Sequence, residues 1–381
     1  MKILQINASY KPAYLYGGPT MSVAKLSEQL VSTGNGVTVF TTTANGKDEL
    51  DIQSNKSTLV DGVSVTYFKR VTKDHSHLSP GLLINLWQNV RGFDVVHIHA
   101  WWNLVSVFSA FIALTRKVPV VISPRGTLSD YSFQNKNSFI KILIHNFLGK
   151  KILKHSYLHA TSVAEKKALL NIVKPAGIFN LANFVKIAKS LPNKQSAGPV
   201  LKLLFLSRIE EKKGLDILLH ALPRLNVPYH LTIAGDGDEN YISILKNIAH
   251  YNHSENNISW IGFQNENKFD VFSEHDLLVL PSYNENFGNV VIESLSAGTP
   301  VLISEHVGLA DYIIEHNLGW ICQTTPQSVS DVINTIAANS MHELEAISMN
   351  APSIIHRDFD DSQLIKKYIN MYQQIIDHGG V

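Results

Sequence analysis

The chain contains few cysteines and few charged residues for its length. Its 381 residues include a single cysteine, Cys322, so an internal disulfide is excluded and a reducing compartment such as the cytoplasm is expected. We predict that Cys322 is a small buried residue with no chemistry of its own. Charged residues make up 17% of the chain and hydrophobic residues 45%, which is the composition of a globular protein.

No stretch has the length and apolarity of a membrane-spanning helix. The most apolar run, residues 95–114, contains two histidines and an asparagine, and we interpret it as a strand, a polar turn and a buried helix. The opening "MKILQINASY" leads directly into a strand and lacks the long apolar core of a signal peptide. These features predict a cytoplasmic location.

The signatures of three other protein classes are also missing. "AGDGDEN", residues 234–240, lacks the third glycine of a dinucleotide fingerprint, which argues against a nicotinamide oxidoreductase. His97 and His99 alternate on a strand, but no third ligand lies close in the sequence, so we predict no metal site. No aromatic-basic motif typical of nucleic-acid binding is present. We therefore expect no bound cofactor and no nucleic-acid partner.

Charge is distributed unevenly along the chain. Residues 1–190 contain 22 Lys/Arg and 9 Asp/Glu, a net charge of +13, whereas residues 191–381 contain 11 and 23, a net charge of −12. Such asymmetry suggests that the two halves face different partners. The basic first half is suited to an anionic substrate or surface.

The pattern of strands and helices predicts two domains. In residues 1–187 short apolar strands alternate with helical segments, and the pattern restarts in residues 198–358 after the polar stretch 186–199. This alternation predicts two Rossmann-like, doubly wound α/β domains with parallel sheets, which would face each other across a cleft. The tail, residues 362–381, predicts an amphipathic helix that could cap either domain.

Two acidic residues flank a predicted helix start in "ENFGNVVIE", residues 285–293. Ligands of parallel sheets bind where strands lead into helices, and backbone N–H groups at a helix start attract anions. Carboxylates accept hydrogen bonds from vicinal hydroxyls, so Glu285 and Glu293 around Gly288 would suit a sugar, a diphosphate and a ribose. The alternative interpretation is that Glu285 is solvated and Glu293 only favours the helix dipole.

Two cations follow another predicted strand in "SRIEEKKG", residues 207–214. Arg208 and Lys213 could neutralise a diphosphate and stabilise it as it leaves. The alternative is a solvated basic turn beside Glu210 and Glu211, since surface ion pairs are common and weak.

The first half offers candidate contacts at three strand ends. The glycine pair in "YGGPT" would let the backbone approach a phosphate or an acceptor, and "HIHAWWN" places a histidine beside two tryptophans that could stack on a sugar. "SPRGTL" supplies an arginine that could contact an acceptor phosphate. These candidates are Gly17, Gly18, His99, Trp101, Trp102 and Arg125.

Residues 131–164 contain five lysines and no acidic residue, interleaved with large apolar residues. A basic amphipathic helix in this region would suit an anionic membrane surface. The alternative is a packed helix with a lysine-rich outer face.

Together these motifs resemble the retaining glycosyltransferases of family 4, which have the GT-B fold. "ENFGNVVIE" matches the family's E-x-F-G-x-x-x-x-E signature, and "SRIEEKKG" matches its arginine followed by Lys-Gly, with Ser207 where glycine is usual. "HIHAWW", "YGGPT" and "SPRGTL" fall at the expected places, and the resemblance spans almost the whole chain. It also implies that the tail helix crosses back to the first domain.

The resemblance implies a role for each candidate residue. Arg208 and Lys213 would bind and stabilise the diphosphate, Glu293 the ribose and Glu285 the donor sugar. Catalytic roles fall to Arg208, Lys213, Glu285 and His99. Donor contacts are expected from Gly18, Arg208, Lys213, Ile261, Phe263, Glu285, Phe287, Gly288, Asn289 and Glu293. Acceptor contacts are expected from Gly17, Trp101, Trp102 and Arg125.

The predicted function is transfer of a sugar from a UDP- or GDP-sugar to a hydroxyl of a glycan or a lipid-diphosphate-linked acceptor. The resemblance implies retention of anomeric configuration, no metal, and a place in bacterial O-antigen or capsule synthesis, in the cytoplasm or at the inner membrane. Two alternatives are a nucleotide-sugar epimerase of the same architecture and a non-catalytic sugar-nucleotide binding module.

Overall fold

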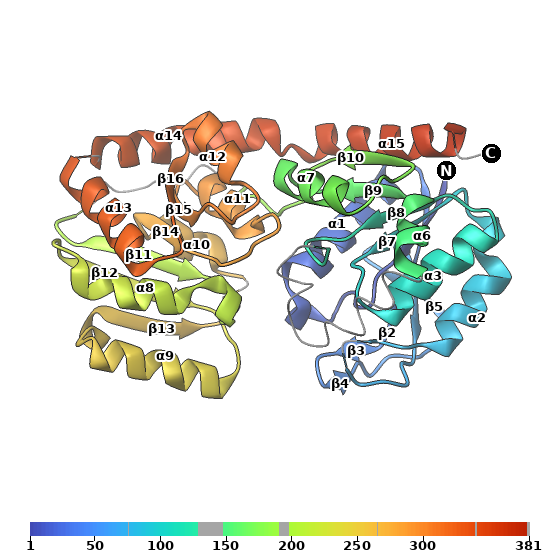
Figure 1. The fold of residues 1–381 in the computed structure, drawn as a ribbon, viewed down its shortest axis with the longest axis horizontal. Coiled ribbons are helices and arrows are strands. Elements are labelled where there is room, and N and C mark those ends of the chain that lie inside the picture. The colour runs from blue at the N-terminus through green and yellow to red at the C-terminus, as the bar shows by residue number, and fades with distance from the viewer. Residues whose placement is uncertain (75, 129–147, 190–197, 265, 340, 379–381) are drawn as a thin grey trace. The chain divides into compact units, whose positions relative to one another are not determined.

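The computed structural model describes residues 1–74, 76–128, 148–189, 198–264, 266–339 and 341–378 (Figure 1). The chain divides into two compact units. Unit 1 consists of Met1–Phe184 together with Asp361–Val381, and unit 2 consists of Val185–Asp360.

Unit 1 is built on an eight-stranded sheet. Its strand order is β10 (Gly177–Asn180), β9 (Tyr157–Ala160), β8 (Val120–Ser123), β7 (Val95–His99), β1 (Lys2–Ile6), β2 (Gly36–Thr42), β6 (Val63–Phe68) and β5 (Ser57–Val60). The strands pair in parallel except at one edge, where β5 is antiparallel to β6. The alternation of apolar strands predicted parallel pairing only, because β5 and β6 are joined by a short turn that periodicity alone did not reveal.

Helices cover both faces of this sheet. One core contains residues of α2 (Pro80–Asn89), α3 (Leu104–Thr115), α6 (Lys150–Lys154) and α7 (Val163–Ile172), and the other contains residues of α1 (Gly18–Ser32) and α15 (Asp361–His378). Alternate residues of the strands feed the two cores: Val96 and Ile98 of β7 face the first, and Val95 faces the second. A small hairpin, β3 (Ala44–Asn45) with β4 (Asp48–Glu49), follows β2.

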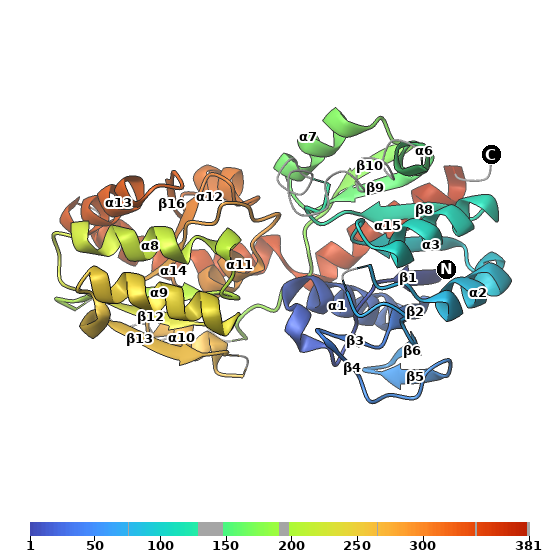
Figure 2. The ribbon, with the colours of Figure 1, turned by 60° about the horizontal axis from the view of Figure 1, so that its bottom comes forward.

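The last helix, α15, is part of unit 1 although it is the last element of the chain (Figure 2). Its apolar stripe packs into the second core. The buried residues of this stripe are Leu364, Ile365, Tyr368, Met371, Tyr372 and Ile375. The spacing predicted this helix, and burial on one face explains why it folds.

Unit 2 has a six-stranded, fully parallel sheet. The order is β13 (Ile258–Gly262), β12 (Tyr229–Ala234), β11 (Leu201–Leu206), β14 (Leu277–Leu280), β15 (Val301–Ser304) and β16 (Gly319–Cys322). Its helices are α8 (Leu215–Ala221), α9 (Glu239–Tyr251), α10 (Lys268–Ser273), α11 (Asn289–Ser296), α12 (Ala310–His316), α13 (Pro326–Asn339) and α14 (Met341–Asp358). Figure 2 shows α8 and α9 side by side on this unit. As expected, Cys322 is buried, and burial raises the pKa of its thiol to about 12.

Helix α1 begins at Gly18, because Pro19 fits the first turn of a helix. Residues 190–197 of the predicted linker and residues 131–147 of the basic segment lie outside the described residues. The described remainder of the basic segment forms the short helix α6 followed by β9, not one continuous helix. Among the described residues no helix is long and apolar enough to cross a membrane.

Candidate active site

The loop after β11 places the predicted cations at the carboxyl end of the unit 2 sheet. A single 3₁₀ turn, Glu211–Lys213, ends at Gly214, whose backbone is left-handed with φ of 71°. A Cβ atom at this position would lie 2.1 Å from the carbonyl oxygen of Pro281, so only glycine fits. Gly214 therefore brings the cationic loop against the segment that follows β14.

Lys213 forms an ion pair with Glu285 across these two loops. Both side chains are largely buried, with 10% and 20% of their surface exposed. Backbone hydrogen bonds fix Glu285 in place: its N–H donates to His306 at 3.1 Å, and its carbonyl accepts from Gly308 at 2.8 Å. Burial alone would raise the pKa of Glu285, but the charge and hydrogen bond of Lys213 outweigh it and the pKa is lowered.

Arg208 belongs to the same cluster. Its guanidinium lies 2.6 Å from a carboxylate oxygen of Glu210, whose other oxygen lies 3.2 Å from Lys212. Burial raises the pKa of Glu210. The positive charges of Arg208 and Lys212 outweigh burial, so the pKa is lowered overall. The structure therefore brings Arg208, Lys213 and Glu285 together. The ion pairs of this cluster join three cations to two carboxylates, and the exposed Glu211 lies in the same loop.

Helix α11 begins directly after Gly288, which has φ of 95°. Val307 and Val291 would crowd a Cβ atom at Gly288, at 3.0 and 3.3 Å. Phe287 is buried against Phe359, with ring centroids 6.3 Å apart, so its side chain is part of the core and only its backbone can reach a ligand. The predicted backbone contacts at Phe287, Gly288 and Asn289 remain predictions.

Glu293 lies in the second turn of α11, and no acidic residue occupies the first turn. The helix-dipole interpretation therefore does not explain it, because that effect is confined to the first turn. Instead Glu293 pairs with Lys268 at 2.7 Å, and both side chains are mostly buried. Sequence reasoning missed Lys268, which lies five residues after Phe263, one of the expected donor contacts.

The two residues proposed to contact the nucleotide base lie at the end of β13. Ile261 and Phe263 are both exposed, at 39% and 64%, which is unusual for large apolar side chains at a strand end. Their exposure leaves them accessible to a ligand.

The residues of unit 1 that were predicted to contact a ligand include both buried and accessible ones. Trp101 is fully buried in the first core, so its ring offers no face to an acceptor, and the predicted stacking role is wrong for this residue. The sequence pattern could not distinguish it from its half-buried neighbour Trp102. Gly17 and Gly18 begin α1, and Gly17 has φ of 64°.

His99 is fully buried at the end of β7, and both ring nitrogens have protein partners. Nε2 lies 2.6 Å from Gln5 Oε1, and Nδ1 accepts from Arg125 Nε at 3.4 Å. Direct contact of His99 with a sugar remains a prediction. His97 is buried and satisfied as expected, with hydrogen bonds of 2.6 Å to Tyr372 and to Ser123.

Arg125 has a left-handed backbone, with φ of 52°, at the end of β8. Its guanidinium donates to Asn183 Oδ1 at 2.7 Å and to His99 Nδ1. No carboxylate of the described residues lies within ion-pair distance of it, although burial lowers its pKa. A half-buried guanidinium held by neutral acceptors retains its affinity for an anion.

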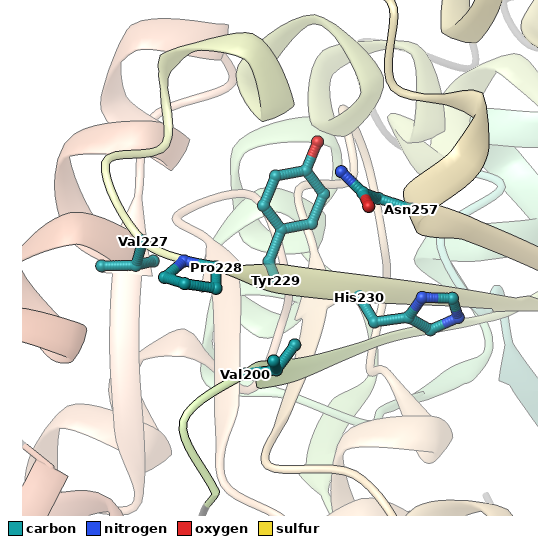
Figure 3. A pocket seen from close by; sticks show the side chains of 6 residues that line it. All are labelled: Val200, Val227, Pro228, Tyr229, His230 and Asn257. Atoms are coloured by element: carbon teal, nitrogen blue, oxygen red, sulfur yellow. The ribbon is translucent and has the colours of Figure 1, made fainter.

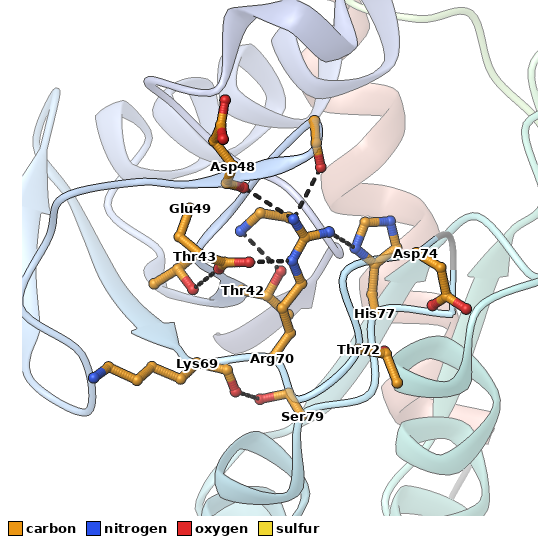
Figure 4. Close-up of polar contacts among 12 residues, drawn as sticks. Thr42, Thr43, Asp48, Glu49, Lys69, Arg70, Thr72, Asp74, His77 and Ser79 are labelled. Carbon is orange, nitrogen blue, oxygen red and sulfur yellow. Dashed lines mark hydrogen bonds and ion pairs between the residues drawn. The ribbon is translucent and has the colours of Figure 1, made fainter.

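A buried arginine, Arg70, connects two loops of unit 1 (Figure 4). Arg70 donates to Glu49 at 2.6 Å and to the carbonyls of Gly46 and Asp48, both at 2.9 Å, and lies 3.3 Å from His77 Nδ1. It therefore joins the β3–β4 hairpin to the segment after β6. Because Arg70 is fully engaged with the protein, we assign it a structural role.

A shallow pocket of about 380 Å³ lies at the opposite edge of the unit 2 sheet (Figure 3). It is lined by Val200, Val227, Pro228, Tyr229, His230 and Asn257, which surround the starts of β11 and β12. Ligands of parallel sheets bind at the carboxyl ends of strands, so we do not assign this pocket to the site. Among the described residues no three His, Cys, Asp or Glu side chains gather as metal ligands.

Two family models match the two halves of the chain. Residues 16–186 match "Glycosyltransferase Family 4", and residues 188–353 match "Glycosyl transferases group 1". The chain belongs to glycosyltransferase family 4. The predicted family and its activity, glycosyl transfer, are thereby confirmed.

Relatives of this glycosyltransferase support the assignment over the full length. An uncharacterized glycosyltransferase of Methanocaldococcus jannaschii is 24% identical, with 98% of each chain covered. A 41.2 kDa protein "in cps region" of Klebsiella pneumoniae is 22% identical over 81% of this chain and 87% of that one.

Solved structures confirm the predicted GT-B fold. Sucrose-phosphate synthase from Thermosynechococcus elongatus superimposes with a TM-score of 0.79, at 17% identity and 99% coverage of both chains. Anabaena HepE, solved in complex with UDP and glucose, gives a TM-score of 0.74 at 20% identity, covering 98% of this chain and 100% of that one.

Proposed function

We propose that this glycosyltransferase moves a sugar from a nucleotide-sugar to an acceptor hydroxyl with retention of anomeric configuration and without a metal. One observation carries the proposal: Arg208, Lys213 and Glu285 belong to a single cluster of ion pairs at the carboxyl end of the unit 2 sheet. A diphosphate needs cations in this position, because negative charge develops on it as the sugar leaves. Chelator treatment should leave the rate of transfer unchanged.

The ion pairs suggest how the donor would be held. The diphosphate would recruit Arg208 and Lys213, and Lys213 would then be shared between phosphate oxygens and Glu285. Glu285, which stays ionised because its pKa is lowered, would accept hydrogen bonds from sugar hydroxyls. Glu293, held by Lys268, would accept those of the ribose.

The acceptor hydroxyl would attack on the face from which the phosphate leaves, and a phosphate oxygen would take its proton. Glu285 is not suited to act as a covalent nucleophile, because it is paired with Lys213 and committed to hydroxyl binding. Retention can be read from the anomeric signal of the product in proton NMR. An inverted product would contradict the mechanism.

Glu293→Ala and Glu285→Ala variants test the two carboxylates separately. We expect Glu293→Ala to weaken nucleotide binding measured by calorimetry, and Glu285→Ala mainly to lower kcat. Full activity and unchanged donor affinity in both variants would contradict the assignment.

The donor nucleotide is proposed to be UDP or GDP, and the known UDP complex of HepE makes UDP the first to test. A thermal-shift panel of nucleoside diphosphates and nucleotide-sugars would separate them. An epimerase, the alternative function, would convert the sugar nucleotide without an added acceptor. Incubation with the donor alone therefore discriminates between the two reactions.

The proposed acceptor is a glycan or a lipid-diphosphate-linked sugar in surface polysaccharide synthesis, in line with the Klebsiella relative described by its cps region. Arg125, which lacks a carboxylate partner among the described residues, would contact an acceptor phosphate. Trp102 and Gly17 remain candidate acceptor contacts, and Gly18 remains a candidate donor contact.

An anionic membrane is the proposed partner surface. Ile84 and Trp87 of α2 and Phe108 and Phe111 of α3 are exposed, and α2 and α3 pack side by side (Figure 2). The guanidinium of Arg116 lies 5.0 Å from the ring centre of Trp87. Helices α2, α3 and α6 contain no acidic residue, and α6 contributes three lysines.

Sedimentation with liposomes containing anionic lipid at low salt tests this partner. Trp87→Ala and Phe111→Ala should reduce the bound fraction, whereas Tyr251→Ala, an exposed aromatic of α9 in unit 2, should not. Failure of the wild-type protein to sediment would exclude the membrane partner while leaving the transfer reaction untouched.

A further inference from the structure

A continuous chain of buried hydrogen bonds runs through unit 1 from the C-terminal helix to Arg125. It links side chains of β1, β7, β8, β9 and α15, and every contact in it is 3.4 Å or shorter. In order, its members are Arg125, His99, Gln5, Tyr372, His97, Ser123, His159 and the carbonyl of Leu181. The donor and the acceptor of each bond can be assigned by starting from the two ends of this chain of hydrogen bonds.

At the first end, Arg125 can only donate, so His99 Nδ1 accepts and the ring proton of His99 lies on Nε2. That proton is donated to Gln5 Oε1 at 2.6 Å, and the amide of Gln5 donates to the Tyr372 hydroxyl at 3.1 Å. The Tyr372 oxygen already accepts one bond, so its own hydrogen is donated onward to His97 Nδ1 at 2.6 Å.

At the other end, the carbonyl of Leu181 can only accept, from His159 Nε2 at 2.9 Å. A neutral His159 must then accept at Nδ1 from Ser123, 2.6 Å away. The Ser123 oxygen therefore accepts from His97 Nε2, also at 2.6 Å. The two ends give the same direction, which leaves all three imidazoles neutral with the proton on Nε2.

The charge in this region is consistent with that assignment. Burial, together with neighbouring cations and rings, holds the pKa of His97 and His99 well below the usual value, and burial lowers the pKa of His159 to about 3. Arg125 is then the only charged member of this hydrogen-bond chain. Adding a proton to His99 Nδ1 would set two donors against each other, and the Arg125 contact would be lost.

We propose that Gln5, His97 and Tyr372 are positioning residues, which hold Arg125 through this one-way chain so that its guanidinium can bind an anionic group of the acceptor. The inference rests on the proposed function, because that function supplies the anionic acceptor. Tyr372 connects α15 to this chain of hydrogen bonds. Among the described residues, its hydroxyl is the only hydrogen-bonded link between Gln5 and His97. Tyr368 of the same helix is a side branch at the far end: its hydroxyl donates to the carbonyl of Ala182 at 3.0 Å, and its oxygen lies 3.2 Å from His159 Nε2.

The first test is the protonation pattern itself. Long-range proton–nitrogen correlation spectra of histidine-labelled protein distinguish Nδ1–H from Nε2–H. We expect all three buried histidines to show the Nε2–H form at neutral pH and to keep it at pH 6. A charged ring or an Nδ1–H form at any of the three would overturn the proposed direction.

The second test asks whether the chain positions Arg125. Inorganic phosphate is titrated in the absence of any sugar nucleotide, and the ring-nitrogen signals of His99 report its binding. Tyr372→Phe should weaken phosphate binding at this position about tenfold, since the hydroxyl that accepts from Gln5 and donates to His97 is lost and the chain is broken there. Tyr368→Phe, which also removes one buried hydroxyl, should leave the affinity unchanged.

Equal weakening by Tyr372→Phe and Tyr368→Phe would reduce the chain to a general packing role and overturn the inference. Absence of any phosphate effect on His99 in the wild-type protein would overturn the anion role of Arg125. Neither experiment involves a donor or turnover. A failure of glycosyl transfer would therefore count against the proposed function alone.

Discussion

At the scale of single residues, the cations of the proposed donor site are paired with carboxylates in the protein without ligand. Lys213 and Arg208 each contact an acidic partner, and those partners keep lowered pKa values in spite of burial. A buried carboxylate that loses its partner becomes strongly destabilising. The same pairs that would receive a diphosphate therefore also stabilise the empty protein.

Replacing Lys213 by methionine tests this dual role. Glu285 would be left buried without its cation, so we expect its pKa to rise and the free energy of unfolding to fall by about 3 kcal/mol. Donor affinity should fall as well. Lys212→Met is the matched control, because Lys212 pairs only with the more exposed Glu210. Urea unfolding and nucleotide titration measure both effects; equal losses in the two variants would contradict the assignment.

The buried histidines predict an acid-sensitive unit 1. His97, His99 and His159 lie in unit 1 and His275 in unit 2, and burial lowers the pKa of all four. Below the unfolded value of about 6.5 the unfolded chain binds protons that the folded chain does not, so stability falls as pH falls.

Each such histidine contributes a slope of up to about 1.4 kcal/mol per pH unit, from about pH 6.5 toward its lower folded pKa. Urea unfolding between pH 7.5 and 5, followed by domain-specific fluorescence, should therefore show a steeper loss for unit 1 than for unit 2. The same slope in both units, or a flat profile, would show that the histidines titrate normally in the fold.

At the scale of elements, periodicity and turn residues predicted most strands and the C-terminal helix. They could not predict contacts made by distant side chains. Lys268 looked like an ordinary helix-start residue until the fold placed it against Glu293. Trp101 and Trp102 are adjacent and identical in chemistry, and only packing determines that Trp101 is in the core.

The candidate motifs were predictable for a related reason. "SRIEEKKG" and "ENFGNVVIE" both follow buried strands, and parallel strands bring their carboxyl ends to one edge. The hydrogen-bond chain in unit 1 gave no such signal, because its members come from five elements and meet only after α15 has packed.

Helix α15 should contribute strongly to the stability of unit 1. Met371 is buried in the second core, whereas Gln373 is exposed on the outer face. We expect Met371→Ala to lower the free energy of unfolding by about 2–5 kcal/mol, from lost burial and the resulting cavity. Gln373→Ala should change it by less than about 0.5 kcal/mol. A small effect of Met371→Ala in urea unfolding would indicate that α15 detaches easily from its unit.

At the scale of the whole molecule, the function that we propose is divided between two units, each with its own hydrophobic core. The acidic second half of the chain contains the cationic cluster for the donor, and the basic first half contains Arg125 and the exposed surface of α2 and α3. The net charge of each half of the sequence therefore does not indicate where the proposed donor contacts lie. The local arrangement of ion pairs does.

This division predicts that a donor nucleotide stabilises one unit and not the other. A ligand that binds only the folded state adds about 2.7 kcal/mol of stability at a concentration of 100 times its Kd. Scanning calorimetry with UDP should therefore shift the transition of unit 2 upward and leave that of unit 1 in place. Glu293→Ala should abolish the shift, whereas Tyr372→Phe, which lies in unit 1, should preserve it. If UDP shifted the unit 1 transition instead, the donor would bind beside Arg125 and the assignment of the two half-sites would have to be reversed.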